Sequence, residues 1–213
     1  MLEKLPDVVG EVLGEVRAGL SNTLFHAVDL RHGMATLKLA SLAFVDHAPM
    51  PQQYTADGPG LSPPLHWSGV PAQATEVLLI VEDADSPTPQ PLVHAIAHGL
   101  PGGGGPDDGA GALAEAALSA VGDAEPLVAM GRNSLLQSIW LPPDPPPGHG
   151  VHRYVFQLFA LGPGAPLPDT PGREAARNAV QQRGLASGCL IGTYERASTE
   201  ISEPATSGPL MSA

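Results

Sequence analysis

The stretch Glu76–Asp83, EVLLIVED, constrains the fold more than any other part of the sequence. Its five central residues, Val77 to Val81, are all apolar, and a short run of this kind is typical of a strand that is covered on both faces. A short buried helix has the same composition, so periodicity alone leaves that alternative open. If the segment is a strand, other parts of the chain must pack on both of its sides.

Further short apolar runs, separated by turn residues, follow from Ala35 onward. Predicted strands are TLKLASLAF from Thr36, PLVHAIAHG from Pro91 and HRYVFQLFAL from His152. The 25 glycines and 24 prolines indicate many turns and irregular connections. This pattern predicts a mainly β protein of the sandwich type rather than alternating βαβ units.

Residues 1 to about 20 are predicted to form a helix, because apolar residues recur there at spacings of three and four. The stripe consists of Leu5, Val8, Val9, Val12, Leu13, Val16 and Leu20. It could pack on its own domain or form the contact of a homodimer, and the sequence leaves both alternatives open.

Two further short helices are predicted. One covers Ala112 to Ala120, inside the Gly- and Ala-rich connection Pro101–Pro126. The other lies near the C-terminus, where Thr170 can cap, Pro171 can take the first position and Gly184 can end the helix.

Composition narrows the range of partners and compartments. A formal net charge of -12 repels nucleic acid, so nucleic acid is not expected as a partner. The single cysteine, Cys189, allows no internal disulfide and is expected to be a buried small hydrophobe. The sequence shows no signal-peptide pattern and no apolar stretch of roughly 20 residues, which indicates a cytoplasmic protein without a transmembrane segment.

Two segments carry the polar residues of a candidate site. In VEDADSPTPQPLVHAIA, Asp83 and Asp85 are two residues apart, so on an extended chain both carboxylates point the same way; turn formation before Pro87 is the structural alternative. In DPPPGHGVHRYVFQLFAL, His152 and Tyr154 alternate onto one face of the predicted strand. That face is polar at its beginning and apolar further along.

These two segments resemble the paired signatures of the phosphatidylethanolamine-binding protein family, especially its bacterial Raf kinase inhibitor-like branch. Three other stretches are similar to the family as well, and the resemblance covers roughly residues 36 to 197. They are MPQQYTADGPGLSPPLHWSGVP from Met50, GRNSLLQSIW from Gly131 and LIGTYER from Leu190.

The resemblance implies a β-sandwich with peripheral helices and a small pocket for phosphate, acetate or a phosphorylated headgroup. The residues that match the pocket motifs or their loop are Asp83, Asp85, His94, Pro146, Gly148, His152 and Tyr154. Four positions depart from the family pattern and are expected to alter the pocket wall and the choice of ligand: Ala84, Ser86, Leu92 and Trp140.

The resemblance also implies the domain organisation and the role. We expect an N-terminal helical extension (1–35), a phosphatidylethanolamine-binding-protein-like domain (36–200) and a flexible tail (201–213). The protein is expected to be a non-enzymatic binding or regulatory module without a cofactor, with a kinase or protease as a possible protein partner. Family members place a cis bond before the proline that matches Pro87, so a cis Ser86–Pro87 bond is predicted.

Two other functions remain open from the residues. A phosphoester or ester hydrolase could use Asp83 with His94 or His152 as acid and base. A metal site could draw on the histidines of HAIAH and HGVH together with aspartates. In the anion pocket itself, histidines and a tyrosine would donate hydrogen bonds, and protonation of His94 and His152 would strengthen binding as pH falls.

Overall fold

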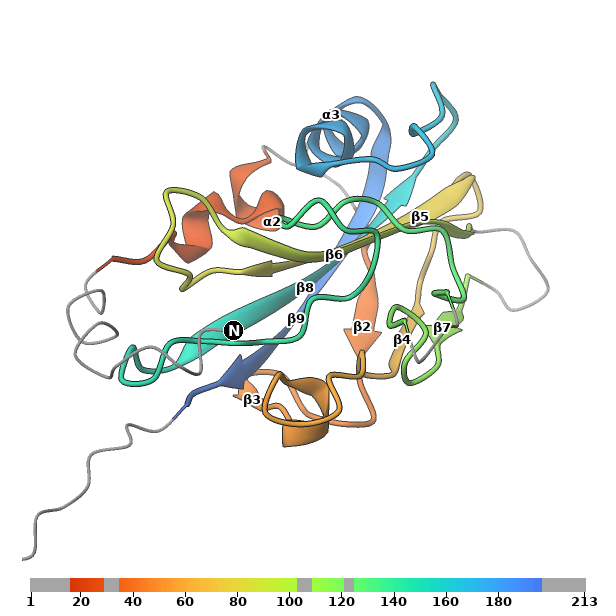
Figure 1. Ribbon diagram of the computed structural model, residues 1–213. Helices are drawn as coiled ribbons and strands as arrows, with labels where there is room; N and C mark the ends of the chain where they lie inside the picture. The colour runs from red at the N-terminus through yellow and green to blue at the C-terminus, as the bar shows by residue number, and fades with distance from the viewer. Residues whose placement is uncertain (1–15, 29–34, 103–108, 121–124, 197–213) are drawn as a thin grey trace, which may run out of the picture.

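The computed structural model describes residues 16–28, 35–102, 109–120 and 125–196. Its main sheet has six strands: β1 (Ala35–Thr36), β3 (Ala48–Pro49), β5 (Glu76–Asp83), β6 (Leu92–Pro101), β8 (His152–Leu161) and β9 (Gly184–Tyr194). They run in the order β1, β9, β8, β5, β6, and β3 also pairs with β9. Figure 1 shows the long strands β5, β6, β8 and β9 crossing the centre of the molecule.

A second sheet and a few helices cover the main sheet. The second sheet consists of β2 (Lys38–Ala40), β4 (Leu65–Ser68) and β7 (Gly111–Leu113). The helices are α2 (Leu24–Ala27) and α3 (Arg173–Arg183), with single 3-10 turns η2 (Leu20–Asn22) and η3 (Gln52–Tyr54). The prediction of a mainly β sandwich-like fold with peripheral helices is therefore confirmed.

Strand β5 is covered on both faces, as its continuous apolar run predicts. Val77 and Leu79 pack in the larger core, together with residues of β2 and β4 from the second sheet. Leu78 and Ile80 point the opposite way and pack against α2 and α3. Because the side chains of a strand alternate between faces, one apolar run supplies both cores.

On the helical side, a buried polar cluster fastens the peripheral segments to the sheet. The carboxylate of Glu82, 0% exposed, accepts hydrogen bonds from the Leu24 backbone N–H (2.6 Å) and the Gln157 amide (2.9 Å). It also pairs with the Arg173 guanidinium of α3 at 2.6 Å. The Gln157 amide oxygen in turn accepts from the Phe25 backbone N–H. The partners of Glu82 lie on three different elements, so the cluster joins α2 and α3 to β5 and β8.

Two helix predictions require correction. The segment predicted as a helix from Ala112 to Ala120 contains β7 followed by turns, because Gly111–Leu113 pairs antiparallel with β4. Pairing in a sheet here overrides the helical preference of alanine. The C-terminal helix exists and ends at Gly184 as predicted, but its N-cap is Gly172 rather than Thr170.

The predicted N-terminal helix lies mostly outside the described residues, which begin at Val16, and Val16 to Gly19 are not helical. The homodimer contact that this helix would form stays a prediction. The tail 201–213 also lies outside the described residues.

Candidate functional site

The candidate site lies where three strand ends meet. Strands β5 and β8 are antiparallel, so the end of one lies beside the beginning of the other. The register places Asp83 opposite Tyr154 on β8 and opposite Leu92 on β6. The two sequence segments that resemble the family signatures are thus adjacent in space.

A cavity of about 310 Å³ opens at this edge. Four of the predicted site residues line it: Asp83, His94, Pro146 and His152. Ser86 and Leu92, two of the four positions expected to alter the pocket wall, also line it, whereas Ala84 and Trp140 do not. The remaining lining residues were not predicted as site residues. They are Pro87, Leu135, Leu141, Pro142, Asp144 and Pro145. The wall is therefore mostly apolar, with carboxylates and imidazoles at a few points.

Asp83, His152 and His149 form a buried chain of hydrogen bonds. His152 Nδ1 lies 2.8 Å from Asp83 Oδ2, and His152 Nε2 lies 2.6 Å from His149 Nδ1. The other oxygen of Asp83 accepts from the Asp85 backbone N–H at 2.8 Å. Both ring nitrogens of His152 are therefore engaged within the protein, and the expectation that His152 offers an N–H to a ligand is not met in this arrangement.

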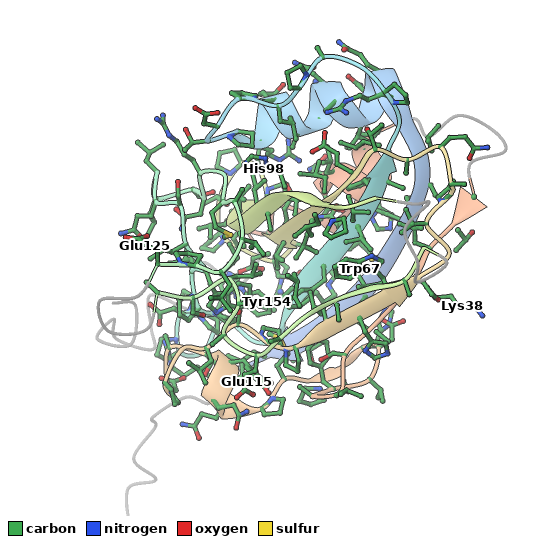
Figure 2. The ribbon with its side chains drawn as sticks, turned by 90° about the vertical axis from the view of Figure 1, so that its right-hand side faces the viewer. Lys38, Trp67, His98, Glu115, Glu125 and Tyr154 are labelled. Carbon is green, nitrogen blue, oxygen red and sulfur yellow. The ribbon has the colours of Figure 1, made fainter. Side chains whose placement is uncertain are left out.

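His94 and Tyr154 meet beneath the cavity. Their rings are in edge contact, with centroids 5.1 Å apart, and Tyr154 also stacks on His152. His94 Nε2 and the Tyr154 hydroxyl are both buried and have no hydrogen-bond partner in the described part of the chain. In Figure 2, Tyr154 lies in the interior of the molecule, whereas Glu115 and Lys38 lie at its periphery.

The protonation states of these two groups follow from their burial. Desolvation lowers the pKa of His94, so its imidazole is neutral near pH 7, and the prediction that it titrates there is wrong. Desolvation, with the charge of Asp83 adding to it, raises the pKa of Tyr154 well above its usual value. The hydroxyl is thus a permanent donor, while the buried imidazole carries no charge.

Asp85, Gly148 and Tyr154, all predicted as ligand-binding residues, do not line the cavity, although the ring of Tyr154 contacts that of the lining residue His94. The chain turns at Ala84, so Asp85 does not point the same way as Asp83. Its carboxylate makes a two-pronged contact with Arg153, at 2.7 and 2.8 Å, and pairs with Arg17 at 3.0 Å. Desolvation alone would raise the pKa of Asp85, but the hydrogen bonds from Arg153 and Arg17 and the charge of Arg153 together lower it, so Asp85 anchors the loop in its ionised form.

The loop after Asp85 is tied down by Ser86, one of the departures from the family pattern. The Ser86 hydroxyl donates to the Asp83 carbonyl (3.2 Å), accepts from the Leu92 backbone N–H (3.2 Å) and bonds to the Thr88 hydroxyl (2.8 Å). The Ser86–Pro87 peptide bond is trans, so the prediction of a cis bond is wrong.

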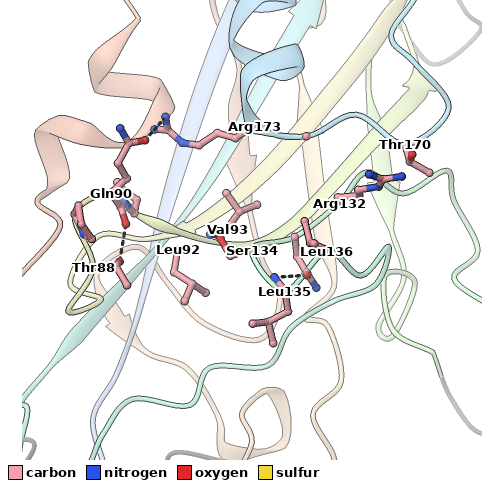
Figure 3. A pocket seen from close by; sticks show the side chains of 14 residues that line it. Thr88, Gln90, Leu92, Val93, Arg132, Ser134, Leu135, Leu136, Thr170 and Arg173 are labelled. Atoms are coloured by element: carbon pink, nitrogen blue, oxygen red, sulfur yellow. Dashed lines mark hydrogen bonds between the residues drawn. The ribbon is translucent and has the colours of Figure 1, made fainter.

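A larger, more open groove of about 680 Å³ adjoins the cavity and shares Leu92 and Leu135 with it. Figure 3 shows its sides, formed by residues 88–93 and 132–136, with Arg173 and Thr170 above. Leu135 and Leu136 are 55% and 77% exposed, so the groove offers apolar surface directly outside the cavity.

Two other features bear on the chemistry of the chain. The described residues contain no group of three or more His, Cys, Asp or Glu arranged to hold a metal ion. Burial raises the pKa of the Cys189 thiol to about 12, which keeps it protonated and unreactive near neutral pH.

The buried, neutral His94 makes stability dependent on pH. As pH falls through 6.5, the ordinary pKa of histidine, the unfolded chain takes up a proton at this position that the folded chain does not. The free energy of unfolding should therefore fall with falling pH, by up to about 1.4 kcal/mol per pH unit from this group. Urea unfolding between about pH 5 and 7 measures how steeply the free energy of unfolding depends on pH.

This slope should be smaller in His94→Gln and unchanged in the control His66→Gln, which alters an exposed histidine. A slope in His94→Gln equal to that of the wild type would show that His94 is not its source.

None of the helices in the described ranges is long and apolar enough to cross a membrane.

Among curated proteins, a UPF0098 protein of Mycobacterium tuberculosis is 38% identical over 159 residues, covering 75% of this chain and 70% of that protein. A UPF0098 protein of Methanothermobacter thermautotrophicus is 32% identical over 168 residues, covering 75% and 99%. LppC of M. tuberculosis, named as a lipoprotein, is 34% identical over 159 residues, covering 75% and 72%.

Solved structures show the same fold. The phosphatidylethanolamine-binding protein homologue CT736 of Chlamydia trachomatis is 32% identical with a TM-score of 0.63, covering 76% of this chain and 98% of that one. YbcL of E. coli is 22% identical with a TM-score of 0.64, covering 76% and 99%, and supports the fold alone. The model of the phosphatidylethanolamine-binding protein family matches residues 40–195. On these grounds the chain belongs to the phosphatidylethanolamine-binding protein family.

Proposed function

We propose that this protein is a non-enzymatic binding or regulatory protein that holds a small anion in the 310 Å³ cavity. The ligand is phosphate, acetate or the phosphate of a phosphorylated headgroup. The observation that carries the proposal is the pair of buried polar atoms without a protein partner, Tyr154 Oη and His94 Nε2. Leaving a buried polar group unsatisfied costs about 1–3 kcal/mol, and a bound oxyanion would remove that cost at the Tyr154 hydroxyl.

The Tyr154 hydroxyl is the donor that such an anion needs. Burial raises its pKa well above the usual value, so the hydroxyl keeps its hydrogen near neutral pH. A hydrogen bond from a neutral donor to a charged oxygen contributes about 1.5–3 kcal/mol. Binding therefore depends on hydrogen bonds at fixed positions rather than on the charge of the whole protein, which is -12.

The carboxylates around the cavity have protein partners. His152 bonds to Asp83, and Arg196 pairs with Asp144 at 2.8 Å and with Asp57 at 2.7 Å. Pairing reduces the repulsion that Asp83 and Asp144 exert on an anion. An organic substituent on the ligand can leave the cavity past Leu92 and Leu135 into the larger groove, which accommodates a phosphorylated headgroup as well as a free ion.

A cytoplasmic location and a kinase or protease partner are further parts of the proposal. The location is supported by the single cysteine, which allows no internal disulfide, while one relative is named as a lipoprotein. The partner rests on the family resemblance alone. A hydrolase role finds less support, because the neutral, desolvated His94 is poorly suited to accept a proton near pH 7.

Calorimetric titration of the full chain with inorganic phosphate and with acetate tests the proposal. Each anion should bind once per chain, and saturation with acetate should weaken the apparent affinity for phosphate, because both occupy the same cavity. Binding of neither anion would contradict the proposal, as would binding of both without competition. Release of phosphate from a generic phosphoester by the same preparation, lost in Asp83→Asn, would favour the hydrolase alternative.

A further inference from the structure

We propose that the larger groove beside the cavity docks an extended peptide segment of a partner protein, one that presents two large apolar side chains and a carboxylate. The groove has a volume of about 680 Å³ and lies between residues 88–93, residues 132–136 and the start of α3 (Figure 3). It shares only Leu92 and Leu135 with the anion cavity, so this inference does not depend on a ligand bound there.

Two adjacent exposed leucines supply the apolar part of the groove. Leu135 is 55% exposed and Leu136 is 77% exposed. Neither belongs to the buried cores of the described chain. Apolar side chains that gather on the surface beside a groove are typical of an interaction site.

The loop that carries the leucines is held in place by Asn133, which is 3% exposed. The Asn133 side-chain oxygen accepts from the backbone N–H groups of Leu135 (2.9 Å) and Gln137 (3.0 Å). Its amide donates to the Ile139 carbonyl (3.1 Å), and its own carbonyl accepts from the Leu136 N–H (2.9 Å). Because the loop is ordered before any partner arrives, binding costs little loop entropy.

Leu136 adopts a backbone conformation that leucine disfavours. Its φ is 62°, in the left-handed region where a bulky side chain is uncommon. Residues in such conformations persist where their surroundings hold them, and they cluster at functional sites. Here the bonds from Asn133 hold the turn, while burial of Leu136 in the chain does not offset the strain. A contact with a partner supplies that burial.

The charge of the groove is opposite to that of the whole chain. The chain has 22 acidic and 10 basic residues, yet the lining of the groove includes two arginines and no aspartate or glutamate. One of them, Arg173, pairs with the buried Glu82. The other, Arg132, is exposed and has no carboxylate partner in the described ranges, where every other arginine has one. Arg132 is therefore the cation that a partner can reach.

The start of α3 adds to this positive end of the groove. The N-cap is Gly172, so no side chain caps the first turn, and Gly172 itself lines the groove. The Arg132 backbone N–H donates to the Pro171 carbonyl at 2.9 Å, which places Arg132 beside the helix N-terminus. A helix N-terminus carries a partial positive charge. A carboxylate that reaches Arg132 thus meets two sources of positive potential.

These features fit a peptide better than a lipid tail. An acyl chain would contact the leucines but would leave Arg132 without a partner, because the charge of a lipid lies in its headgroup. An extended peptide advances about 3.3 Å per residue and places side chains of different kinds along its length. One segment can therefore bring apolar side chains to Leu135 and Leu136 and a carboxylate to Arg132. Salt screens the more distant negative charges of the chain, so the neighbouring arginine dominates at contact.

Selection of short random peptides displayed on phage, with the full wild-type chain as bait and Leu136→Ser as counter-selection, tests the proposal. The recovered peptides should combine two large apolar residues with an aspartate or glutamate. A synthetic peptide of a recovered sequence should bind Leu136→Ser about tenfold or more weakly than the wild type, because the variant removes an apolar contact from the groove. Chemical denaturation checks that the variant is folded.

Reversing the charge of Arg132 tests the acidic preference. Arg132→Glu should bind the recovered acidic peptides about tenfold or more weakly, and a selection repeated with this variant should recover lysine or arginine in place of the acid. Lys38→Glu is the control, because it reverses an exposed cation on β2 of the second sheet and should leave the preference unchanged.

The outcomes identify the occupant of the groove. The inference is overturned if no recovered peptide distinguishes the wild type from Leu136→Ser, or if Arg132→Glu selects the same acidic peptides. Binding to vesicles of phosphatidylethanolamine and phosphatidylglycerol that is lost in Leu136→Ser would overturn it in favour of a lipid surface. A wild-type dimer that is lost in Leu136→Ser would overturn it in favour of a second copy of the chain. Tyr154→Phe should bind the recovered peptides like the wild type, so failure of the anion site would leave this inference standing.

Discussion

Replacing Arg173 with leucine should lower the free energy of unfolding by about 3–5 kcal/mol, because it removes the cation beside a fully buried carboxylate. Glu82 is 0% exposed, and without Arg173 its charge would be held only by the Leu24 backbone N–H and the Gln157 amide. Chemical denaturation of the wild type and the variant measures the difference.

A matched control lies one turn further along α3. Arg177 is 41% exposed and pairs with the exposed Glu174, so Arg177→Leu should change the free energy of unfolding by about 0.5 kcal/mol or less. The double variant Glu82→Leu/Arg173→Leu removes both charges and should recover part of the loss. If Arg173→Leu were no more destabilising than Arg177→Leu, the buried pair would not hold the helices to the sheet as described.

Replacing Tyr154 with phenylalanine should raise the dissociation constant for inorganic phosphate about tenfold or more. The substitution removes one buried hydroxyl and leaves the ring contacts with His94 and His152 in place. Since that hydroxyl has no partner in the described part of the chain, its loss should leave the free energy of unfolding of the ligand-free protein unchanged or slightly raised. Calorimetry measures the affinity, and urea unfolding without phosphate measures the stability.

Tyr194→Phe is the control for this prediction. Tyr194 lies opposite His152 on the neighbouring strand, but its hydroxyl already has a protein partner, because it donates to Asp57. Its substitution should affect stability, because Asp57 loses a donor, and should leave phosphate affinity within about twofold of the wild type. Equal losses of affinity in the two variants would indicate that the Tyr154 hydroxyl has no specific contact with the anion.

The parts of the fold that were predictable from the sequence are those where local pattern and tertiary environment agree. The runs Glu76–Asp83 and His152–Leu161 match β5 and β8 in the structure, because both are apolar and bounded by turn residues. Strand β9 was not predicted as a strand, since its glycines lower strand propensity. Two of them are required by close packing: a Cβ at Gly188 would lie 2.6 Å from the Leu37 carbonyl oxygen, and one at Gly192 would lie 2.5 Å from Met50 Cγ.

Only those residues of the candidate site that belong to a recognisable motif could be predicted from the sequence. Asp83, His94 and His152 converge on the cavity because antiparallel pairing joins the ends of their strands. Asp85 was placed beside Asp83 on the assumption of an extended chain, whereas the turn at Ala84 directs it to Arg153. Leu135 and Asp144 lie in segments that the family resemblance covers, but they were not predicted as lining residues, since they reach the cavity through irregular segments whose course is set by tertiary contacts.

The charge state and hydrogen bonding of His94 could not be predicted from the sequence either. A histidine in the sequence is expected to titrate near neutrality, and that expectation led to the prediction of a cationic pocket. Burial and the bond to the Leu141 carbonyl make the ring a neutral acceptor instead.

A crystal structure of the full chain grown with inorganic phosphate tests the central claim most directly. We predict a phosphate ion in the cavity, with one oxygen within hydrogen-bond distance of Tyr154 Oη and another within hydrogen-bond distance of His94 Nε2. Density for water alone at these two atoms, at a phosphate concentration far above the dissociation constant measured in solution, would contradict it.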